Sequence, residues 1–343
     1  MKIHLPLADS PIYGYLHHAY LFGIIGHSES FQPWMHSYYT QLFCAKDFVE
    51  LACPVNFYQL DNCPLRETQA ISRSLVNSLT DIHRFIQTSL EQGYHVLSFI
   101  NEYYMPYSDF FGVRNFTHDL LISGYDSEQQ SYLVTNFVDG KYQTFSVSYD
   151  DYENAFNNAA FFDEYGNYEE YKTRICLYRA TDHKYVFTAD SVLYFLKDYL
   201  SATNRLKTLF ANESNLAFGM DVYQYIAEEQ VKVTDGTRAP DGRPLHILWE
   251  HKKCMRAKIE FMLAQGYIKD ETLLSGYEPI ERDVNLQRVA LMKYRQTNNN
   301  DILHSINSNL NRIKDREREV LNRLHDEMLA CKSYFPTTDW VRV

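Results

Sequence analysis

Hydrophobic and polar positions follow different patterns in the two halves of the chain. Up to about residue 180, short segments rich in β-branched and aromatic residues, separated by turn residues, indicate strands. The predicted strands span residues 95–100, 117–125, 131–138, 142–147 and 173–179. Beyond about residue 190 the pattern changes to apolar residues at helical spacing. The predicted helices there span residues 189–212, 220–231, 244–266, 281–297 and 301–331.

Three helices are expected among the strands of the first half. An apolar stretch at 16–25 predicts a buried helix, and residues 67–90 predict a long amphipathic helix. Ser148 is a suitable N-cap for a third helix that runs to about residue 158, and Asp139-Gly140 predicts a hairpin turn. The sequence therefore predicts an α+β domain over residues 1–180, with an antiparallel sheet, and an all-helical domain over 189–335.

The last predicted helix carries a run of mixed charges at 312–319, which is typical of a solvated face. Its apolar stripe needs a partner, which either the same domain or a second subunit can supply, so a homodimer is one expectation. The stripe consists of Ile302, Ile306, Leu310, Ile313, Val320 and Leu324.

Composition narrows the class of protein. The 343 residues include 33 Lys and Arg against 44 Asp and Glu, a net charge of −11, which argues against a nucleic-acid partner. We expect no membrane association, because no apolar run approaches the length of a span, and without a secretory signal we expect a cytoplasmic protein. The six cysteines form no CxxC pair and are expected to be free thiols, with no metal site.

One histidine and one asparagine stand where neighbouring strands could bring them together. His118 is predicted near the start of one strand, and Asn136 lies on the next. Neighbouring strands lie about 4.8 Å apart, so the side chains can touch if the register permits. The pair is interpreted either as a catalytic base with its orienting amide or as a half-buried histidine beside a turn.

Three segments of the first half carry a resemblance to a known family. They are residues 96–106 (VLSFINEYYMP), 118–126 (HDLLISGYD) and 149–156 (YDDYENAF). In these segments the chain resembles the N-terminal domain of the butirosin biosynthesis protein H family, whose relatives include papain-like peptidases that cleave bacteriocin leaders. The resemblance implies a papain-like domain in which His118 is a base oriented by Asn136. It further implies transfer of an acyl group from an acyl or peptidyl carrier protein to a small amine acceptor, in antibiotic or nonribosomal biosynthesis.

The family places a nucleophilic cysteine near the start of its first helix, where this chain has none. Tyr15 occupies that position, followed by His17 and His18, so Tyr15 and His17 are candidate catalytic residues and His18 a candidate substrate contact. Tyr103 and Tyr104 are candidates to line a substrate channel, although core packing explains them equally well. No nucleotide-binding or GxSxG motif is present, so no cofactor is expected beyond a carrier-borne pantetheine.

Three hypotheses explain how the protein could act without the family's cysteine. In the first, His118, with or without His17 or His18, activates the amine directly against a bound thioester. In the second, Cys63 substitutes, because it precedes the helix predicted at 67–90 and a helix N-terminus lowers a thiol pKa. In the third, the protein is an inactive relative that binds a carrier protein or a product. A peptidase is a more distant alternative, because the attacking cysteine is missing.

Overall fold

The computed structural model describes residues 1–46, 55–58, 63–162, 166–205 and 215–332. Among these residues, no helix combines the length and the apolar character needed to cross a membrane. The chain divides into two compact units. The first unit comprises Met1–Phe31 and Cys63–Lys184, and the second comprises Gln32–Asn62 and Tyr185–Val343.

The division differs from the sequence-based one in the segment 32–62, which the sequence analysis placed in the first domain. Contacts with the long helix α8 (Arg243–Ala264) explain why this segment belongs to the second unit. The Nε2 atom of His251 lies 2.7 Å from the carbonyl oxygen of Thr40, and the rings of Phe57 and His251 are 5.9 Å apart.

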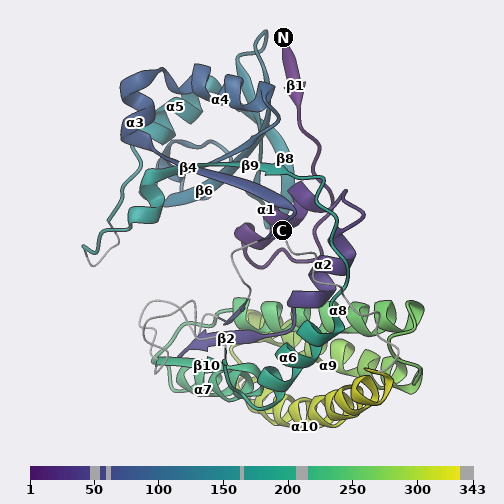
Figure 1. Cartoon of the computed structure of the whole chain (residues 1–343). Helices are drawn as coiled ribbons and strands as arrows, with labels where there is room; N and C mark the ends of the chain where they lie inside the picture. Colours follow the sequence, from purple (N-terminus) through teal and green to yellow (C-terminus); the bar gives the residue numbers. More distant parts are fainter. Residues whose placement is uncertain (47–54, 59–62, 163–165, 206–214, 333–343) are drawn as a thin grey trace. The chain divides into compact units, whose positions relative to one another are not determined.

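An antiparallel sheet forms the centre of the first unit (Figure 1). Its strands follow the order β4-β9-β5-β6-β7-β8, and β1 pairs with the end of β6 beyond β5. The strands are β1 (Lys2–His4), β4 (Arg66–Ser72), β5 (His95–Asn101), β6 (Thr117–Asp126), β7 (Ser131–Val138), β8 (Lys141–Ser148) and β9 (Arg174–Ala180). The predicted antiparallel sheet is confirmed, and the five strands expected from the pattern match β5–β9 closely.

Helices lie on both faces of this sheet. The helices α3 (Arg73–Leu79), α4 (Ile82–Glu91) and α5 (Tyr149–Asn157) lie over one face, where Ile86 and Tyr152 pack on apolar side chains of β5 and β6 (Figure 1). The apolar helix α1 (Leu16–Ile25) lies on the other face, against β4 and β9. The Tyr20 hydroxyl on α1 donates to the Thr135 carbonyl of β7 at 3.1 Å, which fixes α1 on the strand that carries Asn136.

Turn residues set the register of the β7–β8 hairpin as predicted. Asp139 and Gly140 both have positive φ, 51° and 72°, which is the conformation of a two-residue type I′ turn. Val138 therefore pairs with Lys141. Ser148 then caps α5, because its hydroxyl accepts from the Asp151 N–H at 3.1 Å.

The long helix predicted over residues 67–90 is wrong. Its first part is the strand β4, which pairs along its whole length with β9, and two short helices, α3 and α4, follow. Thr80 is extended and Asp81 caps α4 by accepting from the Arg84 N–H at 2.9 Å, so a new helix starts there. Apolar spacing alone could not distinguish a strand from a helix in this segment, because Ile71 fits both a helical and an alternating pattern of apolar positions.

The second unit is mainly helical, with a small antiparallel sheet in the order β10-β2-β3. Its elements are β2 (Leu42–Ala45), β3 (Val55–Phe57), α6 (Ala189–Leu200), β10 (Leu216–Phe218), η4 (Gly219–Asp221), α7 (Val222–Thr234), α8, α9 (Thr272–Thr297) and α10 (Asn300–Cys331), and α2 (Phe31–Tyr38) leads into it. The helix predicted at 189–212 ends at Leu200, and residues 206–214 lie outside the described part. The helix predicted at 281–297 starts earlier, at Thr272, and continues through Pro279.

One carboxylate connects five helices in the core of this unit. Glu317 of α10 is fully buried, and Lys252 of α8 contacts its two oxygens at 2.7 and 2.8 Å. Three tyrosine hydroxyls also donate to Glu317: Tyr199 of α6 at 3.1 Å, Tyr223 of α7 at 2.8 Å and Tyr277 of α9 at 2.6 Å. The prediction that all charges of 312–319 are solvated is therefore wrong at Glu317.

A second lysine of α8 is buried without a carboxylate partner among its described contacts. Lys258 is fully buried and donates to the Tyr39 carbonyl at 3.0 Å and to the Thr40 hydroxyl. Burial lowers the pKa of Lys258 to about 7 from its usual 10.5. The unfolded chain therefore binds more protons than the folded chain between these two pH values.

Stability is thus expected to rise with pH above about 7, by up to about 1.4 kcal/mol per pH unit from Lys258 alone, and to fall as the pH drops toward 7. Urea unfolding at pH 7, 8 and 9 measures this slope. Lys258→Met removes the titrating group and should flatten the slope, whereas Lys293→Met, at an exposed lysine of α9, should leave it unchanged. Equal slopes in the wild type and in Lys258→Met would contradict the assignment.

Candidate active site

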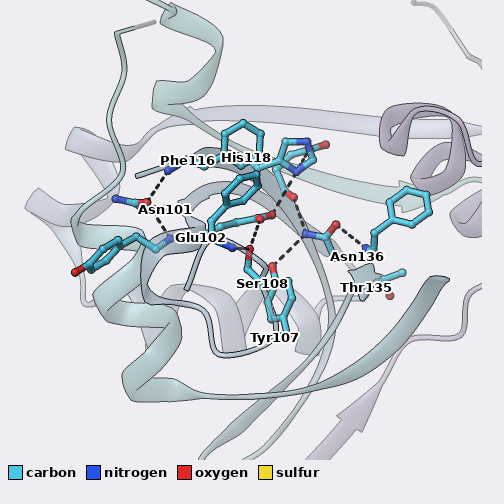
Figure 2. Close-up of polar contacts among 12 residues, drawn as sticks. Asn101, Glu102, Tyr107, Ser108, Phe116, His118, Thr135 and Asn136 are labelled. Atoms are coloured by element: carbon cyan, nitrogen blue, oxygen red, sulfur yellow. Dashed lines mark hydrogen bonds and ion pairs between the residues drawn. The ribbon is translucent and has the colours of Figure 1, made fainter. Parts of the chain in front are cut away.

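A cavity of about 280 Å³ lies in the first unit, where β5 ends and β6 begins (Figure 2). Its walls come from the turn after β5, from the loop 105–116, from β6 and β7, and from the β7–β8 turn. The lining residues are Glu102, Tyr107, Ser108, Asp109, Phe110, Phe116, His118, Asn136, Phe137, Asp139 and Gly140. The cavity therefore contains both members of the pair singled out in the sequence, His118 and Asn136.

Asn101 fixes the loop that forms one wall. Its side-chain oxygen accepts from the N–H groups of Tyr103 and Phe116, both at 3.1 Å (Figure 2). Its amide donates to Asn115 at 2.8 Å. The Glu102 N–H donates to the Phe116 carbonyl at 2.8 Å, so both ends of the loop are closed. Because Asn101 is buried, these bonds are shielded from water, and the loop presents its side chains in a defined arrangement.

The His118 ring lies between an aromatic face and two carboxylates. It stacks on Phe116, with ring centroids 5.3 Å apart and planes inclined by 19°. Its Nδ1 atom lies 3.3 Å from Asp119 Oδ1 and 3.6 Å from Glu102 Oε1. Neither contact meets the geometry of a hydrogen bond, so Nδ1 has no hydrogen-bond partner in the described structure, and each contact is an ion pair only when the imidazole is protonated. Among the described residues no hydrogen bond or ion pair engages Nε2, so this nitrogen is available to a ligand.

Glu102 is the more buried of the two carboxylates. It follows directly on β5, in the 3-10 turn η1 (Glu102–Tyr104), and its side chain is 10% exposed. Its Oε2 atom accepts from the Ser108 hydroxyl at 2.7 Å (Figure 2). Burial raises the pKa of Glu102 above its usual value and the charge of Asp119 adds to the rise, while Ser108 and His118 oppose it. The carboxyl group thus binds a proton more readily than a solvated glutamate does.

The Asn136 side chain is engaged by other groups. Its amide nitrogen donates to the Tyr107 hydroxyl at 3.1 Å and to the Asp119 carbonyl at 3.3 Å, and its oxygen accepts from the Phe137 N–H at 2.7 Å (Figure 2). The register explains the offset, because Thr135 pairs with Leu121, which places Asn136 opposite Leu120 and not opposite His118. Asn136 therefore shares the cavity with His118 and braces its neighbour Asp119.

The other candidates lie on α1 and η1. The Tyr15 and His17 rings stack at 5.6 Å, and the His17 and His18 rings are 4.1 Å apart, so these three residues gather at the start of α1. His17 is exposed and His18 is buried. The Tyr103 and Tyr104 rings contact each other at 5.0 Å, and Tyr104 packs against the core of the first unit. The cavity lining comes from residues other than these five.

The substitute thiol proposed from the sequence loses its physical basis. Cys63 precedes the strand β4 and not a helix, so no helix N-terminus acts on it. Cys63 is also buried, and burial raises the pKa of its thiol to about 11. The cysteines in the described residues, Cys44, Cys63, Cys176, Cys254 and Cys331, are free thiols, and Cys53 lies outside the described residues.

In the part of the chain that the structure describes, no group of three His, Cys, Asp or Glu side chains is arranged to hold a metal ion. The cavity wall includes Asp109 and Asp139, while none of the described residues that line it is Lys or Arg. Such a lining attracts a cation or an amine and offers it aromatic faces.

Sequence reasoning missed Glu102, Ser108 and Asp119 as parts of this site. Glu102 lay inside the quoted segment 96–106, and its acidic character directly after a buried strand was the available signal. Asp119 is adjacent to His118, but neighbouring residues of a strand point to opposite faces, so its proximity to the imidazole could not be expected. The sequence around Ser108 gave no signal of a role in the site.

A scan of protein-family models and a search of curated proteins found no match for the chain.

Proposed function

We propose that the protein is an acyltransferase with a papain-like first unit, which moves an acyl group from a carrier-protein thioester to a small amine. The observation that carries the proposal is the position of His118: its ring lines a cavity at the start of β6, and its described hydrogen bonds and ion pairs leave Nε2 unengaged. An imidazole in this position can accept a proton from a bound nucleophile.

The arrangement of elements supports the papain-like part of the proposal. An N-terminal helix, α1, packs on an antiparallel sheet in which neighbouring strands carry His118 and Asn136. The Tyr20 hydroxyl of α1 is bonded to β7, and the charge of Asp119 contributes to the raised pKa of Tyr20, so α1 lies near the histidine cluster. These relations support the resemblance proposed for residues 118–126.

The lining of the cavity favours an amine as the acceptor. Carboxylates at Glu102, Asp109 and Asp139 attract a cationic group, and Phe110 and Phe137 offer apolar area for its carbon skeleton. The amine reacts in its neutral form. As its nitrogen bonds to the thioester carbonyl carbon, His118 Nε2 takes the N–H proton, and the same proton passes to the sulfur when the C–S bond breaks. The products are an amide and a free pantetheine thiol, and no covalent enzyme intermediate is required.

A binding protein of the same fold is the second candidate. One observation favours it: no cysteine occurs among the described residues that line the cavity, and Tyr15 stands at the start of α1. Such a protein would hold a carrier protein or an amine product without transforming it. The acidic and aromatic lining suits this role as well.

Intact-protein mass spectrometry with an acyl-pantetheine thioester, with and without a panel of amines, tests the proposal. We expect amine-dependent release of thiol and formation of amide, without a mass increment on the protein. A stable increment would instead identify a covalent nucleophile, which peptide mapping would locate. Binding of amines, measured by calorimetry, without turnover of any thioester would favour the binding protein.

A further inference from the structure

The partner of His118 Nδ1 decides which ring nitrogen acts as the base. The family pattern assigns this role to Asn136, but in the structure the Asn136 amide is bonded to Tyr107 and to the Asp119 carbonyl. Nδ1 instead faces Asp119 Oδ1 at 3.3 Å and Glu102 Oε1 at 3.6 Å. We propose that Glu102 and Asp119 are the positioning residues of His118, and that they hold its proton on Nδ1 so that Nε2 is the unprotonated nitrogen in the cavity.

The Glu102 carboxylate and the backbone of Asp119 are each held by a hydrogen bond. Glu102 is fixed by the Ser108 hydroxyl at 2.7 Å, and Ser108 accepts from the Phe110 N–H at 3.1 Å, so the loop supports the carboxylate. The backbone of Asp119 is held by the Asn136 amide at 3.3 Å. Asn136 thus acts on the imidazole indirectly, through the strand that carries the second carboxylate, and its side chain also lowers the pKa of Glu102.

Carboxylates accept hydrogen bonds and do not donate them when ionised, so they favour the tautomer with hydrogen on Nδ1. A half-turn of the ring within its stack on Phe116 would bring Cδ2, and not Nε2, to the carboxylates. When Nε2 accepts a proton, the imidazolium that forms lies beside negative charge, and the contacts of 3.3 and 3.6 Å can shorten into charge-assisted hydrogen bonds. The catalytic meaning of this arrangement rests on the proposed function, but the tautomer does not.

Nitrogen-15 NMR of histidine-labelled protein tests the proposal. The His118 signals are assigned by their loss in His118→Gln and are read at a pH above which they no longer shift. We expect the tautomer with hydrogen on Nδ1 in the wild type. The double variant Glu102→Leu/Asp119→Ser should reduce the ratio of this tautomer to the other by about tenfold or more, which is the effect of losing a charge-assisted acceptor.

Two comparison variants sharpen the result. Asn136→Leu removes the amide proposed by analogy and should leave Nδ1 protonated. Glu102→Gln keeps an acceptor oxygen and should preserve the tautomer with Asp119 intact. A wild-type signal with hydrogen on Nε2, or a change of tautomer in Asn136→Leu as large as that of the double variant, would overturn the proposal. The wild-type reading needs only the His118→Gln variant for its assignment, so a double variant that fails to fold does not prevent the test.

Kinetics separate this proposal from the proposed function. If amine-dependent thioester consumption is found, the double variant should lower kcat by at least tenfold with little change in KM for the thioester, because the carboxylates act through His118 and not on the substrate. If no thioester is consumed, the proposed function fails while the tautomer measurement still decides the roles of Glu102 and Asp119.

Discussion

Replacing His118 by glutamine is expected to lower kcat/KM for amine-dependent thioester consumption by about 10²- to 10⁴-fold, the usual contribution of a general base. Glutamine can still fill part of the space beside Phe116, but it cannot accept and return a proton. The rate is measured from thiol release at several amine concentrations. Amine binding, measured separately by calorimetry, should change far less, because the carboxylates of the cavity remain.

His4→Gln is the matched control, since it makes the same change at an exposed histidine of β1 in the same unit. It should leave the rate unchanged. A rate that survives in His118→Gln would remove the base from the mechanism and would favour the binding protein.

The second large effect concerns stability and is expected at Glu317. Glu317→Leu should lower the free energy of unfolding by at least about 3–5 kcal/mol, because it leaves Lys252 as a buried charge without its counter-ion. It also removes the acceptor of three buried hydroxyls, those of Tyr199, Tyr223 and Tyr277. Urea unfolding followed by circular dichroism measures the loss.

Removing the other partner of the ion pair, by Lys252→Met, should lower the free energy of unfolding less than Glu317→Leu does. The three tyrosine hydroxyls continue to stabilise the carboxylate in that variant. The double variant Lys252→Met/Glu317→Leu should recover part of the loss, since no buried charge remains. The exposed pair of Arg323 and Asp270, 2.8 Å apart, provides the comparison, and Arg323→Met should cost about 1 kcal/mol or less. Equal costs at the buried and the exposed pair would contradict this account.

The behaviour of Glu317 also shows what periodicity can and cannot predict. The apolar stripe of α10 was visible from its spacing, and it skips one place between Ile313 and Val320, where Glu317 completes the same face. A charge in that place can be solvated only if the helix is exposed there. Four other helices close around it, and their arrangement depends on contacts distant in sequence that a local pattern does not contain.

The candidate site was predictable to a similar degree. Alternation and the turn residues at 126–129 were enough to place His118 and Asn136 on neighbouring strands, and the structure brings both to one cavity. The register at this end of the two strands was not predictable, because a bulge between Ile122 and Gly124 shifts the pairing of β6 with β7 by one residue. That shift determines which acceptors meet the imidazole, so the pairing of His118 with Glu102 and Asp119 required the three-dimensional structure.

The discontinuous second unit has a consequence for synthesis on the ribosome. Residues 32–62 belong to the second unit but leave the ribosome before residues 63–184 of the first unit. Their packing partners in α8 and β10 are made only after residue 184. The first unit can complete its sheet once β9 has emerged, while β2 and β3 still lack β10 and α8. The nascent chain must therefore carry an unsatisfied apolar segment through most of its translation, and a fragment that stops at the boundary between the units would retain that segment permanently.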